Sequence, residues 1–211
     1  MRPDDLKPDD LKPDDLNPDD KSSTTDAAHA TYSTGARHLH WWMFALIAIQ
    51  IPLGLVMVWY GDAYKFAPPT GTMYDAHKLI GMTLLVFFLA RIAYRLKNGA
   101  PPDEPTLEPW QKIVSHVTHW AIYALLFIVP LLGWLATSAY GPFRPFGIPL
   151  PGLLSENQAL AARLYGIHKI AAIALAVLLA MHVGAALFHY VIRKDGVLNR
   201  MLPMLPRRDG K

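Results

Sequence analysis

The last long apolar run of the chain, residues 165–193, constrains the fold more than any other stretch. It reads YGIHKIAAIALAVLLAMHVGAALFHYVIR and carries no Lys, Arg, Asp or Glu between Lys169 and Arg193. His168 and His182 are 14 residues apart (182 − 168 = 14), which on an α-helix is about 21 Å of rise and nearly four turns. Both imidazoles therefore face one side of the helix, near opposite faces of a hydrocarbon layer about 30 Å thick. Because ionisable groups inside a membrane span are costly and usually functional, this spacing indicates two stacked metal cofactors.

Three further apolar stretches have the length of a membrane span. With the run above, the predicted spans are residues 39–60, 76–94, 117–138 and 165–193. Trp and Tyr at both ends of the first span form the aromatic belts typical of the membrane interface. Pro52 with Gly54 and Pro130 with Gly133 predict kinks in the first and third spans. The sequence therefore predicts an all-α membrane protein, a bundle of four transmembrane helices in contact with lipid.

The N-terminal residues repeat a five-residue unit, RPDDL, KPDDL, KPDDL and NPDDK. Pro and paired Asp in each unit cannot build a packed core, so residues 1–34 are predicted to be a disordered tail. They have no early apolar segment and do not match a secretory signal peptide. We place the membrane domain at residues 35–203 and a basic C-terminal tail at residues 204–211.

Positive charges gather at the ends of the predicted spans. Net charge is only +3, so we interpret these clusters as membrane topology and expect no nucleic-acid partner. Lys and Arg are enriched in cytoplasmic loops. The larger clusters flank the loop between spans two and three or follow span four: Arg91, Arg95, Lys97 and Lys112, then Arg193, Lys194, Arg200, Arg207, Arg208 and Lys211. Both termini and the middle loop are therefore predicted to be cytoplasmic.

Depth decides which of the nine histidines can pair across the bundle. His77, at the start of span two, is the only outer-side partner for His168. Four histidines in the cytoplasmic half compete to pair with His182: His38, His40, His116 and His119. Two axial imidazoles on an iron porphyrin give a b-type centre for electron transfer, with no open position for oxygen. The chain has no cysteine, which excludes thioether-linked haem and Cys-ligated iron–sulfur clusters.

Four motifs together resemble the bacterial cytochrome b561 family. They are LHWW in span one, AHKLIG in span two, HVTHWAIY at the start of span three, and IHK…MHVGAALFHY…KDGVLNRMLP at the end. The resemblance covers about residues 36–203 and implies a four-helix membrane protein with two b-type haems. It also implies four ligands, His77 with His168 for the outer haem and His40 with His182 for the cytoplasmic one. The resemblance thus selects His40 among the four competitors.

The resemblance further implies an activity. Bacterial members resemble superoxide:quinone oxidoreductases of the inner membrane, in which superoxide is the electron donor and ubiquinone the acceptor. Superoxide is an anion, and a basic outer rim can attract it. The outer-side cations are Lys65, Lys78, Arg144, Arg163 and Lys169. The alternative interpretation of each is an anchor at the membrane interface.

His189 is the candidate catalytic residue at the quinone end. It follows His182 by seven residues (189 − 182 = 7) and so shares its helix face. At the cytoplasmic mouth its imidazole can donate a hydrogen bond or a proton to a quinone carbonyl. His116 and His119 approach the same level and are weaker candidates, and the plain alternative for all three is a polar helix end.

Arg91 is a candidate cofactor-binding residue. It lies 14 residues after His77 (91 − 77 = 14), on the same helix face but on the cytoplasmic side. Its guanidinium is predicted to pair with a haem propionate. The alternative is an arginine that reaches the membrane surface.

Two other classes of function compete with a superoxide oxidase. One is a haem b electron-transfer subunit that docks on a redox partner protein, such as a hydrogenase or a formate dehydrogenase. The short polar loops favour the enzyme, because a large partner needs an extended docking face. The other is an apolar scaffold or transporter without haem, which the placement of the histidines disfavours.

Overall fold

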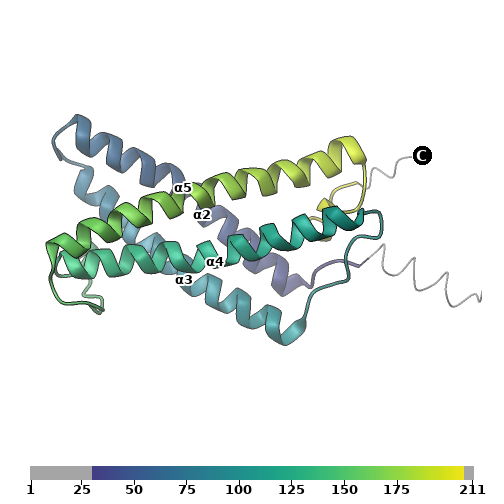
Figure 1. Cartoon of the computed structure of the whole chain (residues 1–211), viewed down its shortest axis with the longest axis horizontal. Coiled ribbons are helices and arrows are strands. Elements are labelled where there is room, and N and C mark those ends of the chain that lie inside the picture. The colour runs from purple at the N-terminus through teal and green to yellow at the C-terminus, as the bar shows by residue number, and fades with distance from the viewer. Residues whose placement is uncertain (1–29, 207–211) are drawn as a thin grey trace, which may run out of the picture.

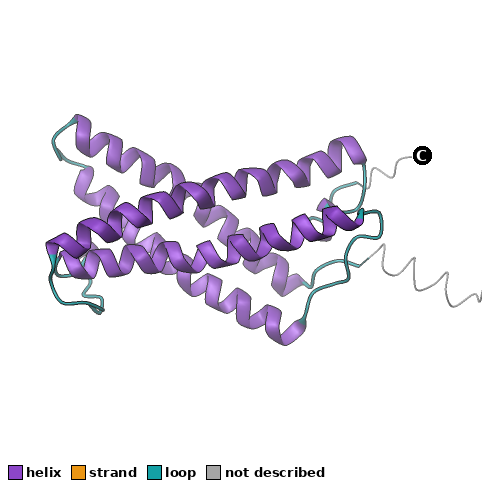
Figure 2. Cartoon of the chain, viewed as in Figure 1, coloured by secondary structure: helices purple, strands orange, loops and turns teal. Residues whose placement is uncertain are grey.

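The computed structural model describes residues 30–206, and four long helices dominate them. They are α2 (Thr34–Ala63), α3 (Thr70–Asn98), α4 (Pro109–Tyr140) and α5 (Gln158–Phe188). Three short turns complete the list: 3-10 turns η4 (Pro145–Gly147) and η6 (Leu198–Arg200), and η5 (His189–Arg193), a π-helical turn that continues α5. The described residues contain no strand (Figure 2). All four helices are long and apolar enough to cross a membrane, which confirms the predicted fold class.

Each helix is longer than its predicted span, and polar caps start α2 and α5 outside the apolar stretch. The Ser33 hydroxyl accepts from the backbone of Ala36 at the start of α2. At the start of α5 the side chain of Asn157 accepts from the backbone of Leu160 at 3.0 Å. α4 begins with Pro109 at its first position, where a proline costs no hydrogen bond. Hydropathy reports the membrane-embedded part of a helix, whereas capping decides where the hydrogen bonds begin.

The four helices run up and down, so the connections alternate between two ends of the bundle (Figure 1). The α2–α3 and α4–α5 connections lie at one end, which we call the loop end. The α3–α4 connection lies at the other, the terminal end, together with both ends of the described chain. Close packing joins α4 to α5, α2 to α3, and α3 to α4, whereas the backbone of α5 approaches α2 and α3 only sparsely.

All four helices contribute to a buried apolar cluster at middle depth. It consists of Met43, Phe88, Ile122, Leu126 and Leu175. Leu175 lies midway between the two histidines of α5, so the cluster separates the two histidine levels along the bundle. Elsewhere the helices present exposed apolar side chains, such as Leu55 and Ile170, which is the surface expected of helices in contact with lipid.

A buried ion pair ties the C-terminal segment to the α3–α4 connection. Nε of Arg200 donates to Oε2 of Glu104 at 2.9 Å, and both side chains are less than a tenth exposed. Arg200 also donates through Nη1 to the carbonyl of Pro102. The indole of Trp41 donates to the carbonyl of Met201 at 3.1 Å. Residues after η5 therefore fold back across the terminal end.

The predicted terminal tails lie mostly outside the described residues, which exclude 1–29 and 207–211. Residues 30–34 of the predicted N-terminal tail belong to the folded body. The backbone N–H of Tyr32 donates to the carbonyl of Arg200 at 3.1 Å, and Thr34 already starts α2. The folded body therefore begins a few residues earlier than the sequence predicted.

Candidate functional site

Two pairs of imidazoles link α5 to the other side of the bundle. At the loop end, the rings of His77 from α3 and His168 from α5 have centroids 6.2 Å apart and planes at 87°. Toward the terminal end, His40 from α2 and His182 from α5 have centroids 6.4 Å apart and planes at 69°. The two histidine side chains of α5 thus reach α3 and α2, the helices that the α5 backbone approaches only sparsely.

The distance between the ring centroids in each pair matches two imidazoles bound on opposite sides of one metal ion. An imidazole nitrogen binds a metal at about 2 Å and the ring centre lies about 1.1 Å behind it, so two rings on opposite sides have centres about 6.3 Å apart. Both pairs match this distance. Of the competing histidines, His119 has its ring centroid 5.1 Å from that of His182, too short for a metal between them.

The other competitors are engaged elsewhere. Nδ1 of His119 donates to the carbonyl of Ser115 at 2.7 Å, four residues back on its own helix. Nε2 of His116 donates to Asp103 at 3.1 Å on the surface, and His38 is exposed. The geometry therefore favours His40 as the partner of His182, a choice that depth alone left open.

Each pair offers only two imidazole ligands, which suits a metal whose other ligands come from a porphyrin. Residues 30–206 contain no group of three or more His, Cys, Asp or Glu side chains that could hold a bare ion. Two facing imidazoles are instead sufficient for an iron porphyrin. Nδ1 of His168 donates to the carbonyl of Val129 at 2.9 Å, which leaves Nε2 free to bind a metal. Nδ1 of His77 is buried without a partner among the described protein atoms.

Arg91 lies near the pair at the terminal end. Its Nη1 donates to the carbonyl of Ala36 at 3.1 Å, which ties α3 to the first turn of α2. The guanidinium also interacts electrostatically with His40 and His182. Arg91 is half-buried, so it supplies a positive charge beside this pair.

His189 has a carboxylate partner that sequence reasoning missed. Its Nδ1 donates to Oδ2 of Asp195 at 2.6 Å, and the two side chains are only 12% and 5% exposed. Nε of Arg193 lies 3.6 Å from the same oxygen, and Oδ1 accepts from the backbone of Val197. The only sequence signal was an aspartate within the short KDG turn after the last apolar run.

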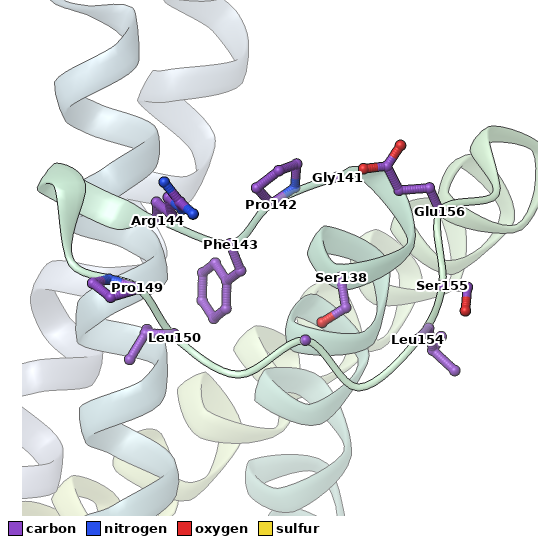
Figure 3. Close-up of a pocket in the computed structure, with 11 residues that line it drawn as sticks. Ser138, Gly141, Pro142, Phe143, Arg144, Pro149, Leu150, Leu154, Ser155 and Glu156 are labelled. Carbon is purple, nitrogen blue, oxygen red and sulfur yellow. The ribbon is translucent and has the colours of Figure 1, made fainter.

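The basic rim at the loop end is partly neutralised. Nζ of Lys78 lies 3.4 Å from Oδ1 of Asp75, and Oδ2 of the same aspartate accepts from the backbone of Phe146 at 3.0 Å. The α4–α5 connection lines an open hollow of about 340 Å³ (Figure 3). Figure 3 shows Arg144 and Glu156 on different sides of it, so the lining of the hollow is not uniformly basic.

Comparison with known proteins identifies the family. The model of the prokaryotic cytochrome b561 family matches residues 31–204. The chain belongs to this family. Cytochrome b561 homolog 2 of Escherichia coli (strain K12) is 31% identical over 176 residues, 81% of this chain and 90% of the relative. The family resemblance of the sequence motifs is therefore confirmed, and the protein is a b-type haem protein of bacterial membranes with several spans.

Two other relatives carry names that bear on function. "Probable superoxide oxidase CybB" of Yersinia pestis is 29% identical over 179 residues, 83% of this chain and 97% of the relative. "Cytochrome b562" of Cereibacter sphaeroides is 30% identical over 165 residues, 78% of this chain and 90% of the relative. This cytochrome b561 protein thus matches its relatives over nearly their whole length.

Proposed function

We propose that this cytochrome holds two b-type haems and transfers electrons from superoxide to ubiquinone. The observation that carries the proposal is the pair of imidazole couples, with ring centroids 6.2 Å and 6.4 Å apart at two depths. The name of the Yersinia pestis relative supports superoxide as the donor. His77 and His168 hold the haem at the loop end, and His40 and His182 hold the one toward the terminal end.

The overall reaction balances with protons taken up at the quinone. Two superoxide anions each lose one electron and become O₂, while ubiquinone takes up two electrons and two protons and becomes ubiquinol. When bound, the haems would supply reversible one-electron iron chemistry. The protein itself must therefore attract an anion at one end and deliver protons at the other.

His189 and Asp195 form the proton-delivering group of the proposal. The carboxylate accepts from Nδ1, so it fixes the orientation of the ring and directs Nε2 away from Asp195. In its doubly protonated form the imidazole keeps the Nδ1 proton on the carboxylate and gives the Nε2 proton to a quinone carbonyl, and Nε2 is then reprotonated from the terminal end. His189 opens the π-helical turn η5, seven residues after His182, so a quinone there lies about 10 Å further along the helix axis than the second histidine pair.

Arg91 and the loop-end cations are assigned electrostatic roles. The half-buried guanidinium beside His40 and His182 balances a haem propionate. Lys65, Arg163 and Lys169 at the loop end raise the local concentration of superoxide. Lys78 contributes less, because Asp75 pairs with it.

The orientation in the membrane follows from charge. Arg95 and Lys97 occupy the last turn of α3, and Arg193 and Arg200 lie in the turns after α5, all at the terminal end. Cytoplasmic flanks carry the excess of Lys and Arg. We therefore place the terminal end in the cytoplasm and the loop end outside the bacterial inner membrane.

Stopped-flow mixing of the purified protein with superoxide tests the activity. Superoxide should reduce the haem absorbance bands, and added ubiquinone should reoxidise them with turnover. Superoxide dismutase in a control mixture should abolish the reduction. Two haems that superoxide does not reduce, but that a co-purifying dehydrogenase does, would replace this function with that of an electron-transfer subunit.

A further inference from the structure

Two turns that combine a proline and a glycine face the histidine pair at the loop end. In α2, Gln50 and Gly54 flank Pro52, and in α4, Val129 and Gly133 flank Pro130. Each flanking couple is four residues apart and therefore lies on one helix face. Both prolines lie inside helices that continue past them, and the kinks predicted from them do not by themselves explain why a glycine accompanies each proline.

His77 sits against the first of these turns. The side-chain amide of Gln50 donates from Nε2 to the backbone carbonyl of His77 at 2.9 Å. A Cβ atom on Gly54 would lie 3.0 Å from Cε1 of the imidazole and 3.4 Å from Nδ1. The ring therefore lies directly against the backbone of α2, in space that any other residue would fill.

His168 sits against the second turn in the same way. Its Nδ1 donates to the carbonyl of Val129 at 2.9 Å. A Cβ atom on Gly133 would lie 3.2 Å from Cε1 and 3.3 Å from Nδ1. Among the glycines of residues 30–206, Gly54 and Gly133 are the two whose missing side chains make room for a histidine ring.

We propose that Gly54 and Gly133 are positioning residues that fix the rotation of the two loop-end imidazoles and hold their planes at right angles. The proposal rests on the proposed binding of haem by His77 and His168. The χ2 torsion of a histidine has a broad energy minimum, so contact with a neighbouring helix decides the ring orientation. Contact of each ring with a glycine backbone limits that rotation, and the 87° between the planes is the result.

The orientation of the two imidazole rings affects the EPR signal of the haem, whereas helix packing by a glycine alone does not. Perpendicular axial imidazoles on low-spin ferric haem give a strongly anisotropic EPR signal, whereas parallel ones give a more rhombic signal. Contacts between a haem-ligating imidazole and its surroundings also tune the reduction potential of the haem. The loop-end haem should therefore show the more anisotropic signal of the two, since the other pair has its planes at 69°.

The test compares Gly54→Ala and Gly133→Ala with Gly71→Ala in the full chain. Gly71 lies in the first turn of the same helix as His77, and an added Cβ there meets no atom within 4 Å. EPR of the oxidised protein, redox titration and haem content by pyridine haemochrome are the readouts. The first two variants should shift the anisotropic signal and the potential of the loop-end haem, or partly lose that haem. The control should match wild type, and the second haem should keep its signal in all three.

The outcomes distinguish the positioning role of the two glycines from the proposed haem ligation by His77 and His168. His77→Ala identifies the loop-end signal by its loss, and a variant that keeps both haems refutes the ligand assignment itself. Because alanine has a higher helix propensity than glycine, glycines with no role at the rings would give unchanged spectra and equal or higher thermal stability in both alanine variants. Unchanged EPR and potential in both glycine variants would overturn the positioning role. If one variant does not fold, the other, on a different helix and against a different ring, still gives the result.

Discussion

Asp195 holds the imidazole of His189 from six residues further along the chain, with Oδ2 accepting from Nδ1 at 2.6 Å. The π-helical turn His189–Arg193 and the left-handed residue Lys194 that ends it bring the two side chains together. A π-turn widens the helix by one residue per turn and often occurs at functional sites. The backbone conformation thus places His189, at the end of the helix, in a buried hydrogen-bonded pair with Asp195.

Removal of this imidazole should slow the quinone half of the reaction. His189→Ala should reduce the rate of ubiquinone reduction by about a hundredfold or more, because a positioned proton donor contributes about 10²–10⁴-fold. Both haem spectra and their reduction by superoxide should stay near normal. Asp195→Asn should give a smaller loss, since an amide oxygen still accepts from Nδ1 but cannot balance an imidazolium charge. A normal quinone rate in His189→Ala would remove the histidine from the mechanism.

The histidine pairs predict which haem each substitution removes. His77→Ala should abolish the loop-end haem and leave the spectrum of the other largely intact, and His40→Ala should do the reverse. His119→Ala is the matched control, because its ring also lies beside His182 but only 5.1 Å away. Pyridine haemochrome assay should count two haems in that control and one in the other variants. A haem lost from His119→Ala and kept in His40→Ala would reassign the pair.

The chain order of the spans was predictable, whereas their ends and the partner of His182 were not. Hydropathy depends only on local sequence, so it found four spans. His40 lies six residues after the start of α2 at Thr34 (40 − 34 = 6), while His182 lies 11 residues before the end of η5 at Arg193 (193 − 182 = 11). The helices thus extend unequally past this pair, which distance from the flanking charges could not reveal.

The polar contacts of the terminal end also could not be predicted. Glu104 and Arg200 are 96 residues apart in sequence, and each lies in a short irregular segment or turn. Only the return of the chain after α5 brings them together. A charged residue in a loop is normally solvated, so nothing local distinguishes Glu104 from its neighbour Asp103.

These two neighbouring acids form a matched stability test. Glu104→Ala leaves Arg200 buried without its carboxylate, and breaking a buried pair costs about 3–5 kcal/mol. Asp103→Ala removes an exposed contact to His116, and exposed pairs contribute about 0–1 kcal/mol. Thermal unfolding monitored by the haem bands should show a clear drop in midpoint for the first variant and little change for the second. Equal midpoints would mean that the C-terminal return contributes little to the stability of the bundle.

Attraction of superoxide by the loop end predicts a salt effect. The second-order rate of haem reduction by superoxide should fall as ionic strength rises, since the Debye length shrinks from about 30 Å at 0.01 M to about 10 Å at 0.1 M. Arg163→Gln and Lys169→Gln should each lower the rate at low salt and weaken its salt dependence. Lys97→Gln, at the terminal end, is the control. A rate independent of salt would show that these cations serve only as interface anchors.

The N-terminal boundary gives a pair of truncations with different expected results. Removal of residues 1–29 should leave haem content and thermal midpoint unchanged, because the Pro- and Asp-rich repeat has too few apolar residues to bury. Removal of residues 1–33 also deletes Tyr32, which donates to the carbonyl of Arg200, and Ser33, which caps α2. Loss of a serine cap costs about 1 kcal/mol, so this longer truncation should lower the midpoint of thermal unfolding. Haem loss with the shorter truncation would instead show that the repeat packs against the membrane domain.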